Sequence, residues 1–206
     1  PPGISPRRTP RALAVALHAH GGQLRLRQGD PVKAVPRVAA ECGAAAVHVS
    51  ADFGPYGTRR DAAIEAALGA VPLVRSGSPY AISAGRVTTA GGATFKVFTP
   101  FYRSWLAHGW PAPAPTITSR VDWHTGLHGI DIPRDPRLPA GLELPEAGEA
   151  AARAAWAAYQ DSDLRHYADL RDRPDLNRTS HMSVFLKWGC IHPRTLLADL
   201  GPADGA

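Results

Sequence analysis

The chain has 206 residues, of which 44% are hydrophobic, and it carries a formal net charge of +5. This length suffices for one large domain or for one domain and part of another. No apolar run approaches the roughly 18 residues of a membrane-spanning helix, so a membrane protein is not expected. The scattered cationic side chains permit a polyanionic partner without requiring one. Cys42 and Cys190 lie far apart, which indicates reduced thiols in a cytoplasmic protein rather than a disulfide framework.

The first half of the chain alternates between helix and strand patterns. Helices are predicted over 10–20, 31–42 and 58–69. Strands are predicted over 23–27, 44–50 and 71–74. Pro36 should kink the second helix, and Thr58 should cap the third. This alternation is typical of a right-handed parallel α/β sheet. Ligands bind outside the carboxyl ends of the strands in such sheets, so loop 50–57 is a candidate wall of a binding site.

The second half of the chain begins with weaker signals. The pair Gly91-Gly92 predicts a hairpin within 86–98, and an aromatic-rich helix is predicted over 99–106. Prolines then cluster and the periodicity is lost, which predicts an extended surface linker. Helical patterns return over 146–159 and 164–170. We therefore expect an α/β domain, a Pro-rich linker and a helical region, over residues 1–112, 113–145 and 146–206.

Two histidines in the expected linker have the spacing of metal ligands. His124 and His128 lie four residues apart, with Asp131 nearby. Such a spacing binds metal when the two side chains share a helix face, but Gly126 and Gly129 argue against a helix there. No second ligand pair is evident, so no metal site is expected.

The densest run of polar residues lies between Tyr167 and Arg194. At its centre Thr179 and Ser180 precede an apolar run, which is the pattern of a capped helix start. The same arrangement can bind a phosphate, because the first backbone N–H groups of a helix have no partner within it. Taken alone, a capped helix without a ligand is the simpler interpretation, since caps far outnumber anion sites.

Several segments together resemble the DNA photolyase/cryptochrome family. In the first half these are GGQLRLRQGDP (21–31), VSADFGPYGTRRDAAIEAAL (49–68) and FKVFTPFYRSWL (95–106). In the second half, YADLRDRPDLNRTSHMSVFLKWGCIHPR (167–194) is similar to a family segment with the same order of motifs. The resemblance implies a Rossmann-like parallel-sheet antenna domain followed by an all-α FAD-binding domain. Because the family's chains are longer, it further implies an internal fragment that lacks the first βα unit and most of the FAD domain.

The resemblance assigns FAD as the cofactor and gives candidate residues for it. Family positions that contact the flavin match Tyr167, Thr179, Ser180, His181, Met182 and Ser183. Hydroxyl groups and helix-start N–H groups suit the pyrophosphate and ribityl oxygens of FAD. The family usually has Arg and Leu where this chain has His181 and Met182, so a charge contact with phosphate becomes weaker or pH-dependent, while apolar volume is kept. Arg171 matches an arginine that reaches toward the DNA backbone.

The resemblance implies light-driven repair of DNA. Reduced FAD donates an electron to a cyclobutane pyrimidine dimer that has been flipped out of the duplex. An antenna chromophore, a folate or a deazaflavin, is implied for the α/β domain. Damaged DNA is then the partner of an enzyme that we expect to be monomeric and cytoplasmic, with its catalytic residues beyond this chain. A cryptochrome-type blue-light receptor without repair activity and a non-functional remnant are the alternatives.

Overall fold

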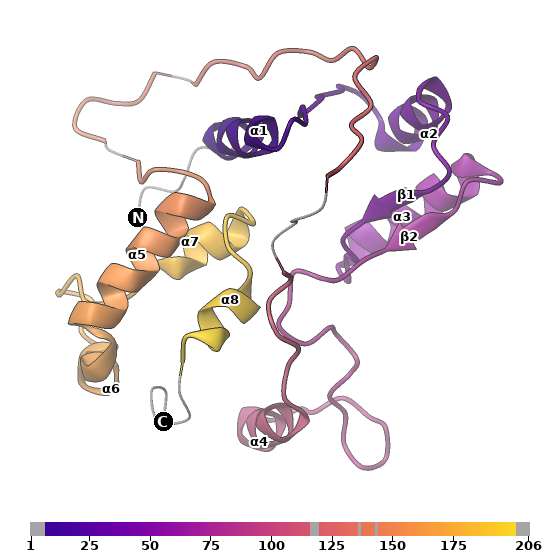
Figure 1. The fold of residues 1–206 in the computed structure, drawn as a ribbon. Helices are drawn as coiled ribbons and strands as arrows, with labels where there is room; N and C mark the ends of the chain where they lie inside the picture. The colour runs from indigo at the N-terminus through magenta and orange to yellow at the C-terminus, as the bar shows by residue number, and fades with distance from the viewer. Residues whose placement is uncertain (1–6, 116–119, 136, 143, 201–206) are drawn as a thin grey trace. The chain divides into compact units, whose positions relative to one another are not determined.

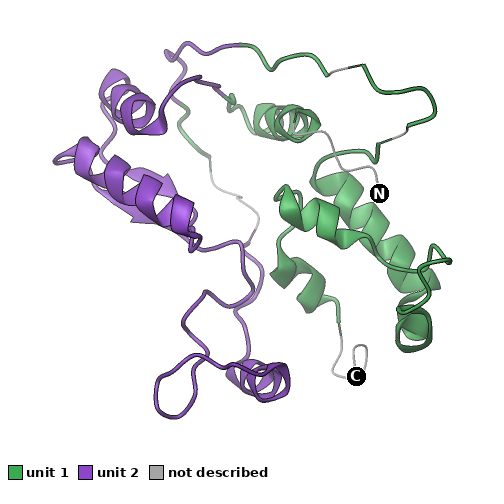
Figure 2. Ribbon diagram, turned by 180° about the vertical axis from the view of Figure 1, so that it is seen from behind, with its two compact units in different colours: residues 1–24, 117–123, 131–206 green, residues 25–116, 124–130 purple. Residues whose placement is uncertain are grey.

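The computed structural model describes residues 7–115, 120–135, 137–142 and 144–200 (Figure 1). The chain divides into two compact units (Figure 2). Unit 1 comprises residues 1–24, 117–123 and 131–206, and unit 2 comprises residues 25–116 and 124–130. Each unit has its own cluster of buried hydrophobic side chains. Within the described residues, no helix is long and apolar enough to cross a membrane.

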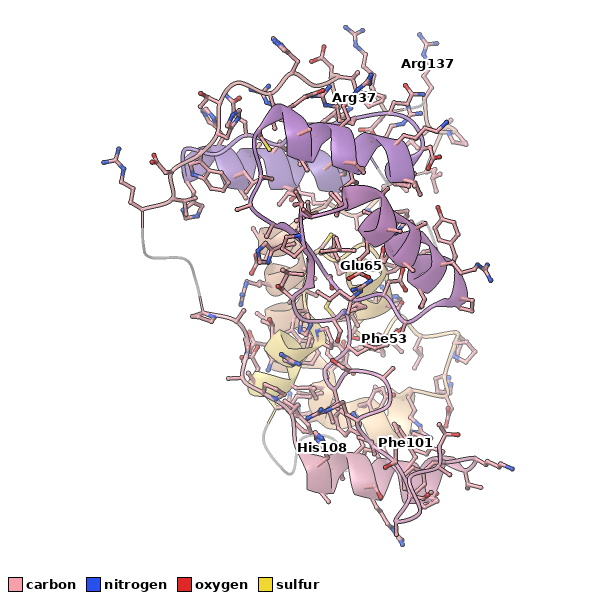
Figure 3. The ribbon with its side chains drawn as sticks, turned by 90° about the vertical axis from the view of Figure 1, so that its right-hand side faces the viewer. Arg37, Phe53, Glu65, Phe101, His108 and Arg137 are labelled. Carbon is pink, nitrogen blue, oxygen red and sulfur yellow. The ribbon has the colours of Figure 1, made fainter. Side chains whose placement is uncertain are left out.

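Unit 2 combines a small sheet with three helices. Its elements are α2 (Pro31–Glu41), β1 (Val47–Val49), α3 (Pro55–Leu68), β2 (Leu73–Arg75) and α4 (Phe98–His108). The two strands pair in parallel, with Val47 opposite Leu73. Their connection through α3 is the βαβ arrangement that the alternating pattern predicts. Arg75 also donates two hydrogen bonds to Glu65, at 2.9 and 3.2 Å, which join β2 to α3. Figure 3 labels Glu65 on α3.

Local interactions explain where the helices of unit 2 begin and end. α2 starts at a proline, and the Asp30 carboxylate before it accepts a hydrogen bond from Val32 N at 3.0 Å. α3 ends at Gly69, whose positive φ of 62° favours glycine. The prediction that Thr58 caps α3 is wrong: its backbone N–H already donates to the Gly54 carbonyl at 2.9 Å, because the helix begins earlier, at Pro55.

Two other predicted elements of unit 2 are also wrong. The expected strand 23–27 makes only an isolated antiparallel bridge, between Leu26 and Ile130. The expected hairpin in 86–98 contains no strand; a tight turn closes it instead, with Thr89 N donating to the Ala93 carbonyl at 2.8 Å. Alternating polarity shows that a segment can form a strand, but a strand also needs a neighbour with which to pair.

α4 carries a row of stacked aromatic rings. The ring centroids of Phe98 and Tyr102 lie 5.6 Å apart, those of Tyr102 and Trp105 6.4 Å, and those of Trp105 and Trp110 4.6 Å. No residue of this helix is buried, and the Phe98 side chain is 72% exposed. α4 therefore presents its aromatic side chains at the surface of unit 2.

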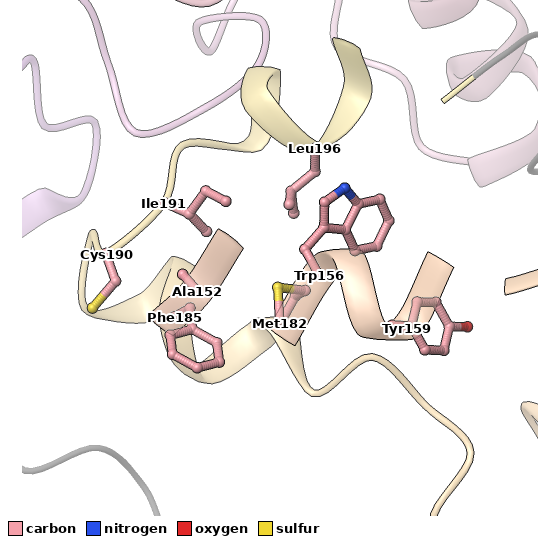
Figure 4. Packing of buried hydrophobic residues seen from close by; sticks show 8 residues of the cluster. All are labelled: Ala152, Trp156, Tyr159, Met182, Phe185, Cys190, Ile191 and Leu196. Carbon is pink, nitrogen blue, oxygen red and sulfur yellow. The ribbon is translucent and has the colours of Figure 1, made fainter. Parts of the chain in front are cut away.

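Unit 1 is helical. Its elements are α1 (Arg8–Ala19), α5 (Glu149–Ser162), the 3₁₀ turn η1 (Leu164–His166), α6 (Tyr167–Leu170), α7 (Met182–Lys187) and α8 (Pro193–Ala198). α5, α7 and α8 bury a common cluster (Figure 4), made of Ala152, Trp156, Tyr159, Met182, Phe185, Cys190, Ile191 and Leu196. The Trp156 indole also donates a hydrogen bond to Asp199 at 3.1 Å. Since short helices are marginal alone, this cluster is what holds α7 and α8.

The described residues between α4 and α5 form no helix. Part of this stretch lies along α1: the Trp123 indole donates to the His20 carbonyl at 2.8 Å, and Arg11 pairs with Asp135 at 2.6 Å. The Trp123 ring covers Gly22, where a Cβ would approach its carbons to within 2.9 Å. These contacts all lie within unit 1, whereas residues 124–130 of the same stretch belong to unit 2.

Candidate functional site

The predicted flavin-contacting residues all lie in unit 1, between the start of α6 and the first turn of α7. Tyr167 is the first residue of α6 and is 44% exposed. Thr179, His181 and Ser183 are exposed and Ser180 is half-buried. Four polar side chains around the start of one helix are thus open to a ligand, as the sequence pattern predicts.

The start of α7 differs from the expected capped helix. The N-cap residue is His181, which follows the two hydroxyl residues expected to cap the helix. The chain enters the helix through a left-handed residue, His181, with φ of 52°, which moves the helix start one residue further along. Ser180 Oγ still accepts a long hydrogen bond, 3.4 Å, from Met182 N. The His181 ring contacts Asn177 Oδ1 at 2.5 Å rather than the helix.

Met182 has a different environment from its neighbours. Its side chain is 4% exposed and packs in the cluster with Trp156 and Phe185 (Figure 4). An apolar residue of this size suits that place, as the family's usual Leu would. A flavin contact at this position would therefore come from the backbone of Met182.

An ion pair joins the loop before α7 to the end of α5. Arg178 donates to Asp163 Oδ1 at 2.7 Å, and the Asp163 side chain is only 14% exposed. The hydrogen bond from Arg178 holds the pKa of Asp163 below its ordinary value, against the opposing effect of burial. The carboxylate is therefore charged throughout the neutral pH range.

Acid is expected to weaken unit 1 through Asp163. A pKa that is lowered in the folded state stabilises the fold fully above the unfolded value, about 3.9 for Asp. That contribution is lost as the pH falls through the lower folded value. We expect the free energy of unfolding to drop more steeply below about pH 4 in the wild-type chain than in Asp163→Asn. Urea unfolding from pH 6 downward measures both slopes, and equal slopes would contradict the assignment.

Tyr159 is a site residue that the sequence analysis missed. Its ring is buried in the cluster, and its hydroxyl points away from the other cluster side chains (Figure 4). Burial raises the pKa of Tyr159, and the nearby Tyr167 and Asp163 act in the same direction. The signal was present in the periodicity, because Trp156, Tyr159 and Asp163 repeat at the spacing of one helix face.

Arg171, the predicted DNA contact, lies beside Tyr167. Its guanidinium carbon is 6.0 Å from the centroid of the Tyr167 ring, and its side chain is 55% exposed. Its ion pair with Asp172 is long, at 3.5 Å. Exposed pairs of this kind contribute little energy, so the guanidinium can exchange this partner for a phosphate.

The predicted antenna wall in unit 2 is built around Asp52. Asp52 Oδ1 accepts a hydrogen bond from Gly54 N at 2.9 Å, and the Phe53 ring lies 6.0 Å from that of Tyr80. Asp61 on α3 is 2% exposed; one of its oxygens accepts from Arg60 at 2.7 Å, and the other has no hydrogen-bond partner among the described residues. Among the described residues no group of three or more His, Cys, Asp or Glu side chains could hold a metal ion.

Comparison with known proteins identifies the class of this chain. Residues 7–118, more than half of the chain, match the family model of DNA photolyase. The chain belongs to the DNA photolyase family.

Relatives extend the match into the helical unit. The chain is 36% identical to a deoxyribodipyrimidine photo-lyase of Thermus thermophilus, over 89% of this chain and 40% of the relative. It is 32% identical to the enzyme of that name from Streptomyces griseus, over 90% of this chain and 42% of the relative. An uncharacterized Synechococcus protein is 31% identical over 91% of this chain and 68% of its own length. The chain thus spans about 40% of the length of the photo-lyases that it matches.

Solved structures give the same fold. A class III photolyase from Agrobacterium tumefaciens superposes with a TM-score of 0.75 at 23% identity, covering 96% of this chain and 45% of that one. A cryptochrome from Synechocystis superposes with a TM-score of 0.69 at 17% identity, covering 95% of this chain and 44% of that one. The fold is therefore photolyase/cryptochrome-like, with mixed helices and a two-stranded parallel sheet.

Proposed function

We propose that this chain is part of a deoxyribodipyrimidine photo-lyase, which uses light and FAD to repair cyclobutane pyrimidine dimers in DNA. The observation that carries the proposal is the 36% identity to a protein of that name across both units. A cryptochrome-type photoreceptor without repair is the second candidate, favoured by the structural similarity to the Synechocystis cryptochrome. In the proposed enzyme the partner is damaged DNA, and the protein is a cytoplasmic monomer.

The donor set around α7 suits FAD. Hydroxyls of Thr179, Ser180 and Ser183 are exposed or half-buried and can bind ribityl and pyrophosphate oxygens. The exposed Tyr167 ring offers an aromatic wall with a polar tip.

In this proposal the candidate residues of unit 1 bind and orient the cofactor and the DNA. FAD, when bound, supplies the excited-state electron that reverses the dimer. The hydroxyls at the start of α7 orient it, and Tyr167 covers one side of it. Arg171, beside Tyr167, holds a DNA phosphate through its forked donors. The reacting centre needs further walls, so the chain alone is expected to bind FAD weakly or not at all.

We further propose the finer division into an antenna domain over 1–112, a linker over 113–145 and the start of an all-α FAD-binding domain over 146–206. A cavity of about 430 Å³ beside β1 supports the first part. Its walls are the free edge of β1, the apolar face of α2 and the extended segment that carries Arg25 and Arg27. An additional parallel strand in this slot would join 23–27 to the sheet, giving the Rossmann-like antenna domain. A folate or deazaflavin is its proposed chromophore.

A hybrid protein tests the proposed function. In it, this chain replaces the matching 185 residues of the Thermus relative. The hybrid is expected to retain flavin absorbance and to remove pyrimidine dimers from DNA under blue light but not in the dark. A hybrid that folds and retains FAD without repairing dimers would favour the cryptochrome alternative. One that folds without FAD would contradict the assignment of residues 179–183.

A further inference from the structure

The loop between α6 and α7 has little structure of its own. Residues 171–179 are all exposed, and none of them lies in a helix or a strand. Its internal contacts are local, such as the ion pair of Arg173 with Asp175 at 2.6 Å, two residues away. Such a loop samples many conformations unless a contact from outside holds it. Yet this loop ends at Thr179 and Ser180, the candidate flavin-binding hydroxyls.

One ion pair reaches from this loop to a helix that does not adjoin it. Among the described residues, the pair of Arg178 with Asp163 is the only ion pair that joins 171–179 to α5. The contacts of Arg171 with Tyr167 and of Asn177 with His181 reach only the adjoining helices. The ion pair spans fifteen positions in sequence, and Asp163 is the C-cap residue of α5. The Ser162 hydroxyl lies 3.3 Å from the other Asp163 oxygen, but its single hydrogen has a nearer acceptor in the Ala158 carbonyl, at 2.8 Å, so Arg178 is the main partner of this carboxylate.

The pair lies where the parts of the candidate site meet. Tyr159 packs in the same cluster as Met182. Asp163 is separated from Tyr167 by the 3₁₀ turn η1 alone, and Arg178, the residue before Thr179, binds it. Neither Arg178 nor Asp163 was among the candidate residues from the sequence.

We infer that Arg178 and Asp163 are positioning residues for the flavin site, which together hold the loop against the end of α5 so that Thr179 and Ser180 keep a fixed place there. This inference rests on the proposed function, because FAD is the ligand whose contacts are positioned. The ion pair touches the site only through the backbone that it restrains. Losing the ion pair should therefore change how well ordered the loop is and how tightly the ligand binds.

An ion pair with one well-exposed partner should contribute little to global stability. The Arg178 side chain is 54% exposed, whereas that of Asp163 is 14% exposed. Removing the Arg178 charge should leave the unfolding midpoint nearly unchanged while the loop opens more often. Amide hydrogen exchange in 171–181 is expected to rise about fivefold.

The experiment compares variants of the full chain. Arg178→Met and Asp163→Asn each remove one charge of the pair, and the double variant Asp163→Arg with Arg178→Asp exchanges the two charges. Arg173→Met is the matched control, because it removes an arginine of the same loop whose ion pair is local. Hydrogen exchange is followed by mass spectrometry in the chain. FAD is titrated by its fluorescence into the chain and into the hybrid that carries the same substitutions, because the chain alone is expected to bind FAD weakly or not at all.

The inference is supported if hydrogen exchange is faster in both single variants, returns to the wild-type rate in the charge-swapped double variant and is unchanged in Arg173→Met. The two single variants should also bind FAD severalfold more weakly. Unchanged exchange in Arg178→Met overturns the restraint itself. Faster exchange with FAD affinity equal to that of the control overturns the positioning role. If the wild-type chain and the hybrid both bind no FAD, the proposed function fails and the positioning role fails with it, whatever the exchange shows.

Discussion

Replacing Phe185 with alanine is expected to lower the free energy of unfolding of unit 1 by about 3–5 kcal/mol. The Phe185 ring is 5% exposed and packs between α5 and α7 in the cluster that holds unit 1. α7 has six residues, too few to form a stable helix without its packing. A cavity at this position should therefore release α7 and the candidate flavin-binding residues at its start.

Phe98→Ala is the matched control for this prediction. It removes the same side chain from α4, where the ring is 72% exposed, so less than about 1 kcal/mol is expected to be lost. Urea unfolding followed by circular dichroism measures the loss of helix in each variant. Equal destabilisation by the two substitutions would show that the cluster around Phe185 does not hold the helical unit.

Replacing Gly57 with alanine is expected to destabilise unit 2 by about 1–3 kcal/mol. A Cβ at this buried position would lie 1.9 Å from Asp52 Oδ2 and 2.6 Å from Asp52 Cβ. Because the second of these atoms is next to the backbone, a rotation of the carboxylate alone does not relieve the overlap. The loop would have to move, and the 2.9 Å hydrogen bond from Gly54 N to Asp52 would be lost.

Gly91→Ala serves as the control for Gly57→Ala. A Cβ at Gly91 would meet no atom within 4 Å, so the free energy of unfolding of this variant should stay within about 0.5 kcal/mol of the wild type. Thermal unfolding of the two variants gives the comparison. A Gly57→Ala variant as stable as Gly91→Ala would mean that Asp52 is not fixed against α3 and that the loop is not a preformed wall.

Local signals in the sequence predicted the regular parts of the fold. Asp30 before Pro31 gave the start of α2, and Gly69 gave the end of α3, because each residue acts through its own backbone neighbours. The parallel pairing of β1 with β2 followed from the alternation of helix and strand.

Features that depend on distant partners were not predictable in the same way. The segment 23–27 has the alternation of a strand, but pairing needs an edge that the segment itself does not supply. The helix start at α7 depends on the backbone of His181, whose positive φ no sequence pattern announces. The ion pair between Arg178 and Asp163 joins positions fifteen residues apart and became visible only in the folded unit.

The left-handed backbone at His181 has a consequence for which residues fit this position. Glycine and asparagine adopt such a backbone most readily, and β-branched residues such as valine and isoleucine are strained there. His and the arginine usual in the family are both unbranched at Cβ, so both avoid that strain. The shape of the backbone therefore restricts this position whatever the charge of the side chain, and an arginine here would keep the turn.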